Sequence, residues 1–453
     1  MNSLATQAEQ AQSILIIGLG QTGLSCARFL LQQGCVVAMM DTREQPPGLA
    51  IIQKEHPEVV VKTGGLDRHL MLQAEMIVLS PGVDPRVAEI EEAQRADIEI
   101  VGDIELFARY ANAPIVAITG SNGKSTVTTL LAEMAIESGK EVKVGGNLGT
   151  PALDLITEPA PDLYIVELSS FQLETVRSLN AFASTILNIS PDHLDRYNSE
   201  QDYRAAKEQI FAGDGVMIIN RDDAAVSQLA DDKRNQIGFS LNASEGVDFG
   251  VITHDGALWL AEGSEPLLAV GSLKIIGKHN LANALAALAL GSAMALPMPA
   301  MLATLEQYSG LPHRCRLVAD NAGVRWFNDS KATNVGACIA AIEGLADCGK
   351  IILIAGGVAK EQDFSELGAV IDQHVAAVIL LGQDAALIAE VIPSQIPSHH
   401  VATMKDAVSK ANEIAQQGEN ILLSPACASF DMFSGYAERG DVFEALVMES
   451  IND

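Results

Sequence analysis

The stretch at residues 115–126 constrains the fold more than any other part of the chain. Four apolar residues, Ile-Val-Ala-Ile, run directly into Thr-Gly-Ser-Asn-Gly-Lys-Ser-Thr, and residues 129–134 then follow a helical pattern. A strand, a glycine turn and a helix start in this order bind phosphate, because the first backbone N–H groups of a helix have no partner within it. Ile118 stands where the general phosphate-loop pattern has its first glycine. The stretch predicts a phosphate-binding loop, with a plain glycine turn before a surface helix as the alternative.

The residue types of this loop indicate its chemistry. Gly120 and Gly123 permit a backbone path that a Cβ atom would obstruct. Lys124 can reach the β- and γ-phosphates of a nucleotide, and the hydroxyl of Ser125 or Thr126 can hold Mg²⁺. We therefore expect a nucleotide and Mg²⁺ to bind here.

Length and composition indicate a multidomain α/β enzyme. The chain has 453 residues, too many for one hydrophobic core, so two or three domains are expected. Its 48% hydrophobic content and 37 glycines suit an α/β protein with many tight turns. A net charge of −29 is explained by solubility, and it also repels nucleic acid and anionic membranes, so we expect neither as a partner.

The cysteines and the N-terminus indicate a cytoplasmic protein. Six cysteines are scattered without a Cys-x-x-Cys pair, so neither a zinc ribbon nor a disulfide framework is indicated. Isolated thiols are typical of a reducing compartment. Residues 1–12 lack the apolar segment of a signal peptide, and the most apolar helix, 284–296, is too short to span a bilayer.

The first part of the chain follows the pattern of a dinucleotide-binding fold. The strand Ser13–Ile17 opens Gly-Leu-Gly-Gln-Thr-Gly at residues 18–23, a complete G-x-G-x-x-G, and the strand Cys35–Met40 ends at Asp41. An acidic residue at this place holds a ribose in Rossmann folds. This favours a rival interpretation, an NAD-dependent oxidoreductase, but the fingerprint does not separate NAD from another diphosphate ligand such as a UDP-sugar. We expect this domain at residues 1–104.

The second domain, expected at residues 105–310, contains the phosphate loop. Its buried strand Leu163–Val166 ends at Glu167. A carboxylate at the end of a strand beside a phosphate-loop strand is a good Mg²⁺ ligand. The glycine-rich loop around Asn147 allows a close approach of the backbone to a ligand.

Three further segments of this domain can be interpreted from their residues alone. His193, in a loop after a strand, could ligate a metal or act as a structural hydrogen-bond donor. On composition alone, Lys207 is a solvated residue of the helix Glu200–Phe211. Residues 235–273 have short alternating runs between turns, which predict a small antiparallel sheet.

The third domain, expected at residues 311–453, alternates strands and helices. Loops at 326–334, 356–360 and 424–430 lie before or after its strands, and so along one rim of a parallel sheet. Taken alone, each loop has the residues of an ordinary turn. Taken together, the three loops indicate a binding site. The strands are expected at Ile351–Ala355, Ala377–Leu381, His399–Ala402 and Asn420–Leu423.

Several of these motifs resemble those of the Mur ligases of peptidoglycan synthesis, and the resemblance covers essentially the whole chain. The matching segments are residues 119–126, Glu-Leu-Ser-Ser-Phe-Gln-Leu at 167–173, Asp-His-Leu-Asp at 192–195, Gly-Lys-His-Asn at 277–280 and Asn-Asp-Ser-Lys-Ala-Thr-Asn at 328–334. Within the family the chain is similar to the D-glutamate-adding member, through residues 18–23 followed by 41–43, Ser-Pro-Gly at 80–82 and Ser-Pro-Ala-Cys-Ala-Ser at 424–429. The Asp-Asn-Pro-Arg motif of the diaminopimelate-adding member is absent.

The resemblance implies an α/β fold of three domains. These are a Rossmann-like N-terminal domain, a central mononucleotide-binding domain with the phosphate loop and a small appended antiparallel sheet, and a Rossmann-like C-terminal domain. It implies a monomeric ATP-dependent ligase with ATP and Mg²⁺ as cofactors. The enzyme would join D-glutamate to UDP-N-acetylmuramoyl-L-alanine through an acyl phosphate, giving ADP and phosphate.

The resemblance also implies roles for single residues, with Lys124, Asn147, His193 and Lys207 as the catalytic ones. ATP would be bound by Gly120, Ser121, Asn122, Gly123, Lys124, Ser125, Thr126, Asn280, Arg314 and Asp329. The UDP-substrate would be bound by Thr22, Asp41, Thr42, Arg43, Gly82, Asn147, Gln172 and His193. D-glutamate would be bound by Lys331, Thr333, Lys360, Ser429 and Phe430, with Tyr436 where Phe is expected. Mg²⁺ would be held by Ser125, Glu167, His193 and a carbamylated Lys207.

Three alternatives stay open at this point. An NAD-dependent oxidoreductase would use residues 18–23 and Asp41, but it leaves residues 119–126 unexplained. A folate-type polyglutamate ligase shares the second domain, but the UDP-like first domain argues against it. A non-enzymatic ATP-gated module would bind ATP without turnover.

Overall fold

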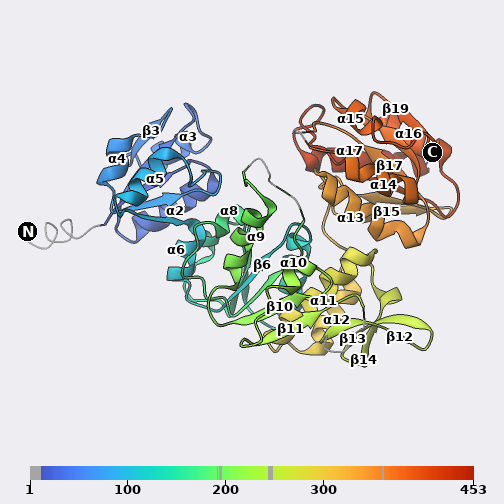
Figure 1. Ribbon diagram of the computed structural model, residues 1–453, viewed down its shortest axis with the longest axis horizontal. Helices are drawn as coiled ribbons and strands as arrows, with labels where there is room; N and C mark the ends of the chain where they lie inside the picture. The colour runs from blue at the N-terminus through green and yellow to red at the C-terminus, as the bar shows by residue number, and fades with distance from the viewer. Residues whose placement is uncertain (1–11, 191, 193–195, 243–247, 360–361, 453) are drawn as a thin grey trace, which may run out of the picture. The chain divides into compact units, whose positions relative to one another are not determined.

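The protein is an α/β protein with three sheets (Figure 1). The computed structural model describes residues 12–190, 192, 196–242, 248–359 and 362–452. The chain packs into two compact units, one up to Phe239 with Ala286–Met301, the other Ser240–Leu285 with the residues from Leu302 on. The three-domain α/β class expected from the sequence is confirmed, while the domain boundaries at 104 and 310 stay predictions. Within the described residues, no helix combines the length and apolarity needed to cross a bilayer.

The first sheet has five parallel strands with helices between them. The strands are β1 (Ser13–Ile17), β2 (Val36–Asp41), β3 (Val60–Thr63), β4 (Met76–Leu79) and β5 (Glu99–Gly102), and the helices are α2 (Gln21–Gln32), α3 (Leu49–Glu55), α4 (Arg68–Gln73), α5 (Ala88–Arg95) and α6 (Asp103–Tyr110). The strand order is β3-β2-β1-β4-β5. The chain order reverses between β1 and β4, and open α/β sheets bind ligands at such a switch point, beside the carboxyl ends of the strands.

The central sheet is built around the strand that precedes the phosphate loop. Its parallel strands are β6 (Ile115–Thr119), β7 (Val142–Gly146), β8 (Leu163–Glu167), β9 (Ala183–Ile186), β10 (Val216–Asn220) and β11 (Gln236–Phe239). The strand order is β11-β10-β9-β6-β8-β7. All five residues of β6 are buried, as the apolar run predicts for a strand covered on both faces. The helices are α7 (Lys124–Glu137), η1 (Ala152–Leu155), α8 (Ser170–Leu173), α9 (Glu200–Glu208), η2 (Gln209–Phe211) and α10 (Ala224–Ser227).

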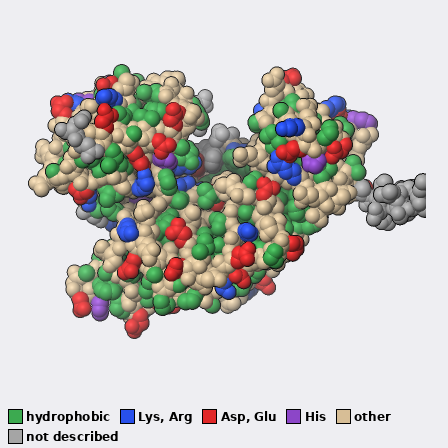
Figure 2. All heavy atoms as spheres, turned by 180° about the vertical axis from the view of Figure 1, so that it is seen from behind, with side chains coloured by type: hydrophobic (Ala, Val, Ile, Leu, Met, Phe, Trp, Pro, Cys, Tyr) green, Lys and Arg blue, Asp and Glu red, His purple; other side chains and the backbone are tan. Residues whose placement is uncertain are grey.

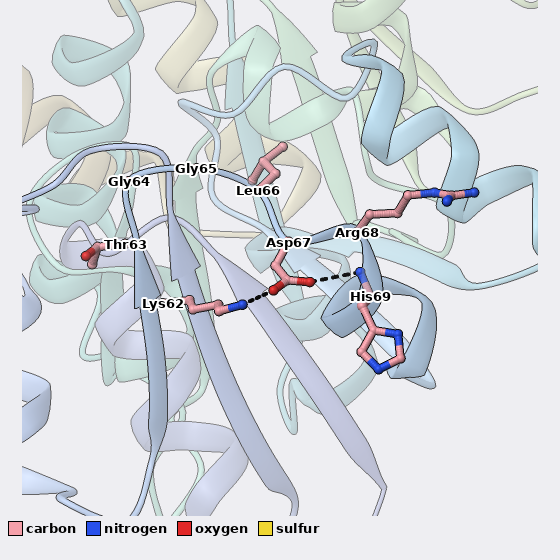
Figure 3. Close-up of a pocket in the computed structure, with 8 residues that line it drawn as sticks. All are labelled: Lys62, Thr63, Gly64, Gly65, Leu66, Asp67, Arg68 and His69. Carbon is pink, nitrogen blue, oxygen red and sulfur yellow. Dashed lines mark hydrogen bonds and ion pairs between the residues drawn. The ribbon is translucent and has the colours of Figure 1, made fainter.

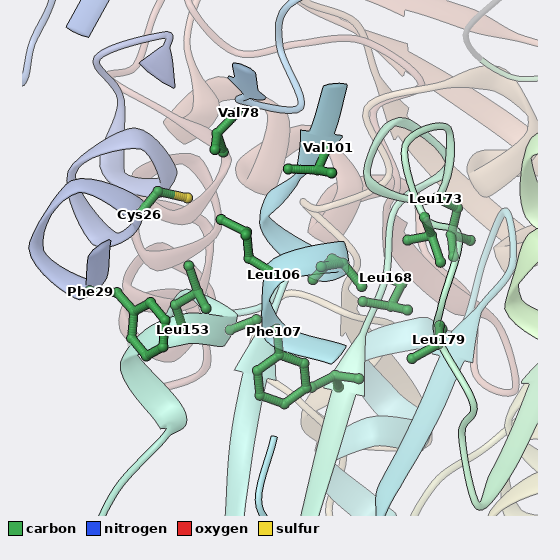
Figure 4. Close-up of a cluster of buried hydrophobic side chains, with 14 of the residues drawn as sticks. Cys26, Phe29, Val78, Val101, Leu106, Phe107, Leu153, Leu168, Leu173 and Leu179 are labelled. Carbon is green, nitrogen blue, oxygen red and sulfur yellow. The ribbon is translucent and has the colours of Figure 1, made fainter. Parts of the chain in front are cut away.

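One hydrophobic core joins the first and central sheets within the first unit. Figure 4 shows Phe29 and Phe107 beside Leu153, with Leu168 and Leu179 close by. The rings of Phe107 and Tyr164 meet edge to face, with centroids 5.2 Å apart. Burying a side chain of this size stabilises the fold by roughly 1.5–3 kcal/mol, so the two sheets form one packed body.

The second unit contains a β-ribbon and a third sheet. The ribbon strands β12 (Phe249–His254), β13 (Ala257–Glu262) and β14 (Glu265–Ala269) are antiparallel, followed by η3 (Val270–Ser272). The third sheet has the order β15-β16-β20-β17-β18-β19, in which only β15 is antiparallel to its neighbour. Its strands are β15 (Arg316–Asn321), β16 (Val324–Asn328), β17 (Ile351–Ala355), β18 (Val375–Leu380), β19 (Ser398–His400) and β20 (Asn420–Leu423). Its helices are α13 (Val335–Leu345), η4 (Ala346–Cys348), α14 (Ser365–His374), α15 (Ala385–Ala389), α16 (Met404–Ile414) and α17 (Tyr436–Asn452), while α11 (Lys278–Ala293) and α12 (Met298–Gln307) contribute to both units.

One prediction for residues 235–273 was wrong in part. The range was expected to form a small antiparallel sheet, and β12, β13 and β14 do so, but its first strand, β11, pairs in parallel with β10. The last two residues of β11 are buried, and the strand extends the parallel part of the central sheet. Figure 2 shows Asp and Glu side chains spread over the face that it draws, in keeping with the negative charge of the sequence.

Candidate functional site

The phosphate-loop sequence folds as a strand, a glycine turn and a helix that begins at Lys124. Gly123 has a left-handed φ of 83°, which favours glycine. A Cβ atom on Gly120 would lie 3.0 Å from the Cβ of Leu187. The Nζ of Lys124 donates to the carbonyl oxygens of Gly120 at 2.8 Å and Ser121 at 2.9 Å. The ammonium group therefore lies across the loop, where a nucleotide phosphate would meet it.

Side chains from outside the loop hold it in this conformation. Asn188 accepts from the backbone N–H of Asn122 at 2.8 Å and donates to its carbonyl oxygen at 3.1 Å. The Oγ of Ser121 accepts from the N–H of Ser190 at 3.0 Å and lies 3.1 Å from the hydroxyl of Tyr203. Sequence reasoning missed Asn188 and Tyr203, because neither belongs to the loop motif.

The carboxylate of Glu167 accepts hydrogen bonds from two other predicted site residues, Ser125 and Asn147. Its Oε2 accepts from the hydroxyl of Ser125 at 2.5 Å, and its Oε1 accepts from the amide of Asn147 at 2.7 Å. Glu167 is only 3% exposed. A hydroxyl and a carboxylate at the end of a phosphate loop fit the preference of Mg²⁺ for oxygen ligands. Among the described residues, which leave out His193, no group of three or more His, Cys, Asp and Glu side chains forms a metal cluster.

Lys207 lies inside the protein, whereas the composition of its helix alone predicted a solvated side chain. It is 1% exposed, and its Nζ donates to the carbonyl oxygen of Gly120 at 3.0 Å and to the hydroxyl of Thr119 at 3.3 Å. The Nζ also lies 4.7 Å from the ring centroid of Tyr203. Burial, reinforced by the charge of Lys124, lowers the pKa of Lys207 well below its usual value, although two nearby carboxylates act in the opposite direction. The lysine is therefore disposed to be a neutral amine beside the phosphate loop.

In the first sheet, Asp41 organises the loops at the switch point. Its carboxylate accepts from the N–H of Leu19 at 2.7 Å and from the guanidinium of Arg43 at 2.7 and 2.9 Å. Burial raises the pKa of Asp41, but the hydrogen bonds from Arg43 and the backbone outweigh burial and lower this pKa to about 2. The hydroxyl of Ser80 donates to the carbonyl oxygen of Gly18 at 3.2 Å. The loops after β1, β2 and β4 thus meet at one edge of the sheet.

The other residues predicted for the UDP-substrate differ in exposure. Thr22 is half-buried in the first turn of α2, and Thr42 and Gly82 are exposed in the loops after β2 and β4. Gln172 is 3% exposed, and its amide accepts from the backbone N–H of Ser169 and donates to the carboxylate of Asp103. The roles of these four residues toward a ligand stay predictions.

A pocket of about 430 Å³ lies at the carboxyl end of β3 (Figure 3). Lys62 forms an ion pair with Asp67, and Asp67 also accepts from the N–H of His69 at 2.9 Å. The N–H of Gly65 donates to the carbonyl oxygen of Asp41 at 3.4 Å. Since none of the predicted site residues lines this pocket and its acid is already paired, we assign it no ligand.

In the second unit, Asp329 is a buried acid near two predicted site segments. Its carboxylate accepts from the hydroxyl of Ser424 at 2.8 Å and the N–H of Cys315 at 3.0 Å. Burial raises the pKa of Asp329 to about 7, against the effect of these hydrogen bonds. The contact with Cys315 holds Asp329 beside the segment that contains Arg314.

Lys331 and Tyr436 lie together. The Nζ of Lys331 is 3.9 Å from the ring centroid of Tyr436, a distance at which a cation is attracted by the ring face. Thr333 donates its N–H to the carbonyl oxygen of Lys331 at 2.8 Å. Ser429 is buried and Phe430 is 69% exposed. Tyr436, which stands where Phe was expected, thus has a cationic partner in the predicted D-glutamate site.

The remaining predicted residues are Asn280, Arg314, His193 and Lys360. Asn280 is 6% exposed and donates to the carbonyl oxygen of Ile276 at 2.8 Å. Arg314 is half-buried. His193 and Lys360 lie outside the described residues.

Family models match the chain in three successive segments. The models described as Mur ligase MurD-like, N-terminal domain, as Mur ligase middle domain and as Mur ligase, glutamate ligase domain match residues 12–102, 118–291 and 313–427. A protein of Nitrosococcus oceani named UDP-N-acetylmuramoylalanine–D-glutamate ligase is 52% identical over 446 residues, which cover 98% of each chain. A protein of the same name from Pseudomonas aeruginosa is 50% identical over 437 residues, covering 96% of this chain and 97% of the relative.

Solved structures of low sequence identity share the fold. A MurF ligase from Thermotoga maritima in complex with ADP has a TM-score of 0.60 at 15% identity, covering 100% of this chain and 99% of that one. A pseudomurein peptide ligase type C from Methanothermus fervidus has a TM-score of 0.61 at 19% identity, covering 97% and 100%. These likenesses concern the fold alone, whereas the family models and the full-length relatives establish that the chain belongs to the Mur ligase family.

Proposed function

We propose that this protein is the ATP-dependent ligase that joins D-glutamate to UDP-N-acetylmuramoyl-L-alanine in peptidoglycan precursor synthesis. The observation that carries the proposal is the arrangement of Lys124, Ser125, Glu167, Asn147 and Lys207 around one phosphate loop. Relatives of about 50% identity over almost the whole length are named UDP-N-acetylmuramoylalanine–D-glutamate ligase. Family membership and the phosphate loop favour a UDP-linked substrate over NAD in the first domain.

The reaction requires activation of a carboxylate, because a carboxylate and an amine do not form an amide in water unaided. An oxygen of the L-alanine carboxylate attacks the γ-phosphorus of ATP, the bond to the β-phosphate oxygen breaks, and ADP leaves. The amine of D-glutamate then attacks the acyl carbon and loses a proton as phosphate departs. The L-alanine carboxylate and ATP are both anionic, and the ammonium group of Lys124 would reduce the repulsion between them. Mg²⁺, held by Ser125 and Glu167, would neutralise charge on the phosphates.

We propose further that Lys207 is carbamylated. A neutral amine attacks CO₂ to form an N–C bond and releases a proton, which leaves an anionic carbamate. The burial of Lys207 and its lowered pKa support the neutral amine that this reaction needs. The carbamate oxygens, together with His193, would provide further ligands for Mg²⁺.

The substrate sites follow the same proposal. Residues 1–104 would bind the UDP-substrate through Thr22, Asp41, Thr42, Arg43 and Gly82, with Asn147, Gln172 and His193 from the domain at 105–310. The domain at 311–453 would bind D-glutamate through Lys331, Thr333, Lys360, Ser429 and Phe430, and ATP would also meet Asn280, Arg314 and Asp329. We propose that the enzyme acts in the cytoplasm as a monomer, without nucleic acid or membrane partners.

The test is phosphate release from ATP with UDP-N-acetylmuramoyl-L-alanine and a panel of amino acids. We expect release with D-glutamate, and little with L-glutamate, D-alanine or diaminopimelate. Release with a folate substrate would favour the polyglutamate ligase, and ATP binding without any release would favour the gated binding module. Binding of NAD in place of the UDP-substrate would favour the oxidoreductase.

A further inference from the structure

Helix α6 carries two buried carboxylates that face the segment after the Mg²⁺-site strand β8. They are Asp103, 3% exposed, and Glu105, 1% exposed. Glu105 accepts from the N–H groups of Arg177 at 2.7 Å and Ser178 at 2.8 Å, and from the Ser178 hydroxyl at 2.8 Å. Both oxygens of Glu105 are thus engaged, which explains its burial by stability alone.

Asp103 is different, because only one of its oxygens accepts a hydrogen bond from a side chain. Its Oδ2 accepts from the Nε2 of Gln172 at 2.8 Å, and its buried Oδ1 has no hydrogen-bond partner. Burial raises the pKa of Asp103 to about 6, against the lowering effects of the Gln172 hydrogen bond and of the backbone N–H groups of Ile104 and of Asp103 itself. A buried acceptor without a partner is unfavourable to folding, so stability alone does not explain why a polar, accepting side chain occupies this position.

The partner of Asp103 belongs to a tightly defined turn. Gln172 forms a capping box with Ser169, in which its Oε1 accepts from the Ser169 N–H at 3.1 Å and its own N–H donates to the Ser169 hydroxyl at 3.2 Å. A carboxylate accepts hydrogen bonds and a side-chain amide has one accepting end, so Asp103 requires the Nε2 of Gln172 to face it and the Oε1 to face Ser169. Asp103 therefore fixes the orientation of this amide.

The same turn is tied to the first sheet at a second point. Glu174 accepts from the guanidinium of Arg196 at 2.5 Å, and the same group of Arg196 donates to the carbonyl oxygen of Val83 at 3.1 Å. Val83 directly follows Ser80-Pro81-Gly82 in the loop after β4. The turn 169–174 thus links the loop proposed for the UDP end of the substrate with the strand that ends at Glu167.

We propose that Asp103 is a positioning residue for the UDP-linked substrate: through Gln172 it holds the turn 169–174 in the conformation that receives the substrate. The inference rests on the proposed function and deepens it by adding a residue of the first domain that acts through another side chain. Asp103 has no part in the chemical steps, and its effect is on binding of the UDP-substrate.

The experiment measures the KM for the UDP-substrate, ATP and D-glutamate in Asp103→Ala, Asp103→Asn and Gln172→Ala. We expect Asp103→Ala to raise the KM for the UDP-substrate by roughly tenfold, the size of one lost buried hydrogen bond, with the KM for D-glutamate unchanged. Asp103→Asn keeps an accepting oxygen and should stay within about twofold of the wild type. Gln172→Ala should resemble Asp103→Ala, and the double variant should add little, because the two residues act as a pair.

Glu105→Gln is the matched control, a second buried carboxylate of the same helix that does not reach Gln172. It should lower the thermal midpoint and leave all three KM values unchanged. If Asp103→Ala and Gln172→Ala keep the wild-type KM for the UDP-substrate, or Asp103→Asn is as impaired as Asp103→Ala, the proposal is wrong while the proposed function stands. A wild-type protein that forms no product from the UDP-substrate contradicts the proposed function and this inference together.

Discussion

The hydroxyl of Ser125, in the first turn of α7, donates a hydrogen bond of 2.5 Å to the carboxylate of Glu167 at the end of β8. The two residues are 42 positions apart in the chain, and the parallel pairing of β6 with β8 brings them together. A hydroxyl and a carboxylate at this distance are arranged so that one Mg²⁺ can take an oxygen from each or contact them through water.

The first prediction concerns this pair. Glu167→Gln removes the negative charge and keeps the shape, so activity should fall by about 10²-fold or more at low Mg²⁺ and recover in part as Mg²⁺ is raised. Phosphate release measured against Mg²⁺ concentration checks this. Glu137→Gln, at an exposed position of α7, should behave as the wild type, and an identical Mg²⁺ response in both variants would exclude Glu167 from the metal site.

The second prediction concerns Lys124. Lys124→Ala should reduce turnover by about 10²–10³-fold, because positive charge is lost where negative charge accumulates in the transition state. The thermal midpoint should change little, since the hydrogen bonds of this lysine to Gly120 and Ser121 stay within its own loop. Steady-state kinetics and a melting curve are the measurements, with Lys140→Ala, at an exposed position, as the control. Near-normal turnover in Lys124→Ala would remove the phosphate-loop assignment.

The third prediction concerns the modification of Lys207. Lys207→Arg keeps a cation but offers no amine for CO₂, so ligase activity should be abolished. The wild-type enzyme should give a carbamate resonance with ¹³C-labelled bicarbonate, and this resonance should be missing from Lys207→Arg.

Lys140→Arg serves as the control for that experiment, since Lys140 is exposed. It should keep both the activity and the resonance. An active, Mg²⁺-bound enzyme with an unmodified Lys207 would show that the buried amine has a structural role only.

Much of the fold could be predicted from the sequence, because apolar runs between glycine turns define buried parallel strands. The strands Ser13–Ile17, Ile351–Ala355 and Asn420–Leu423 begin and end where they were expected. The phosphate loop was also predictable, since its chemistry is contained in a few adjacent residues. Strand β11 was not, because a short run with one buried end does not specify which neighbour it pairs with.

The surroundings of the site were harder to predict. Lys207 was missed as a buried residue, although Tyr203, Ala206 and Lys207 have the i, i+3, i+4 spacing of one helix face and all three are buried. A lysine on such a face normally extends to solvent, so the pattern alone favoured exposure. Asp103 gave no signal, because its importance arises from Gln172, which lies 69 residues away and meets it only in the folded chain.

The last prediction concerns the pH dependence of stability through Asp329. Its folded-state pKa is raised to about 7, above the ordinary value of 3.8, so the native state binds the proton more tightly than the unfolded state does. The stabilisation is therefore complete below about pH 4 and is lost as the pH rises through about 7, by up to about 4 kcal/mol, because a difference of one between the folded and unfolded pKa values corresponds to about 1.36 kcal/mol. Asp329→Asn cannot ionise, so its denaturant midpoint should fall less between pH 5 and pH 8 than that of the wild type. Asp372→Asn, at an exposed position, should keep the wild-type slope, and equal slopes in wild type and Asp329→Asn would mean that Asp329 is ionised throughout this range.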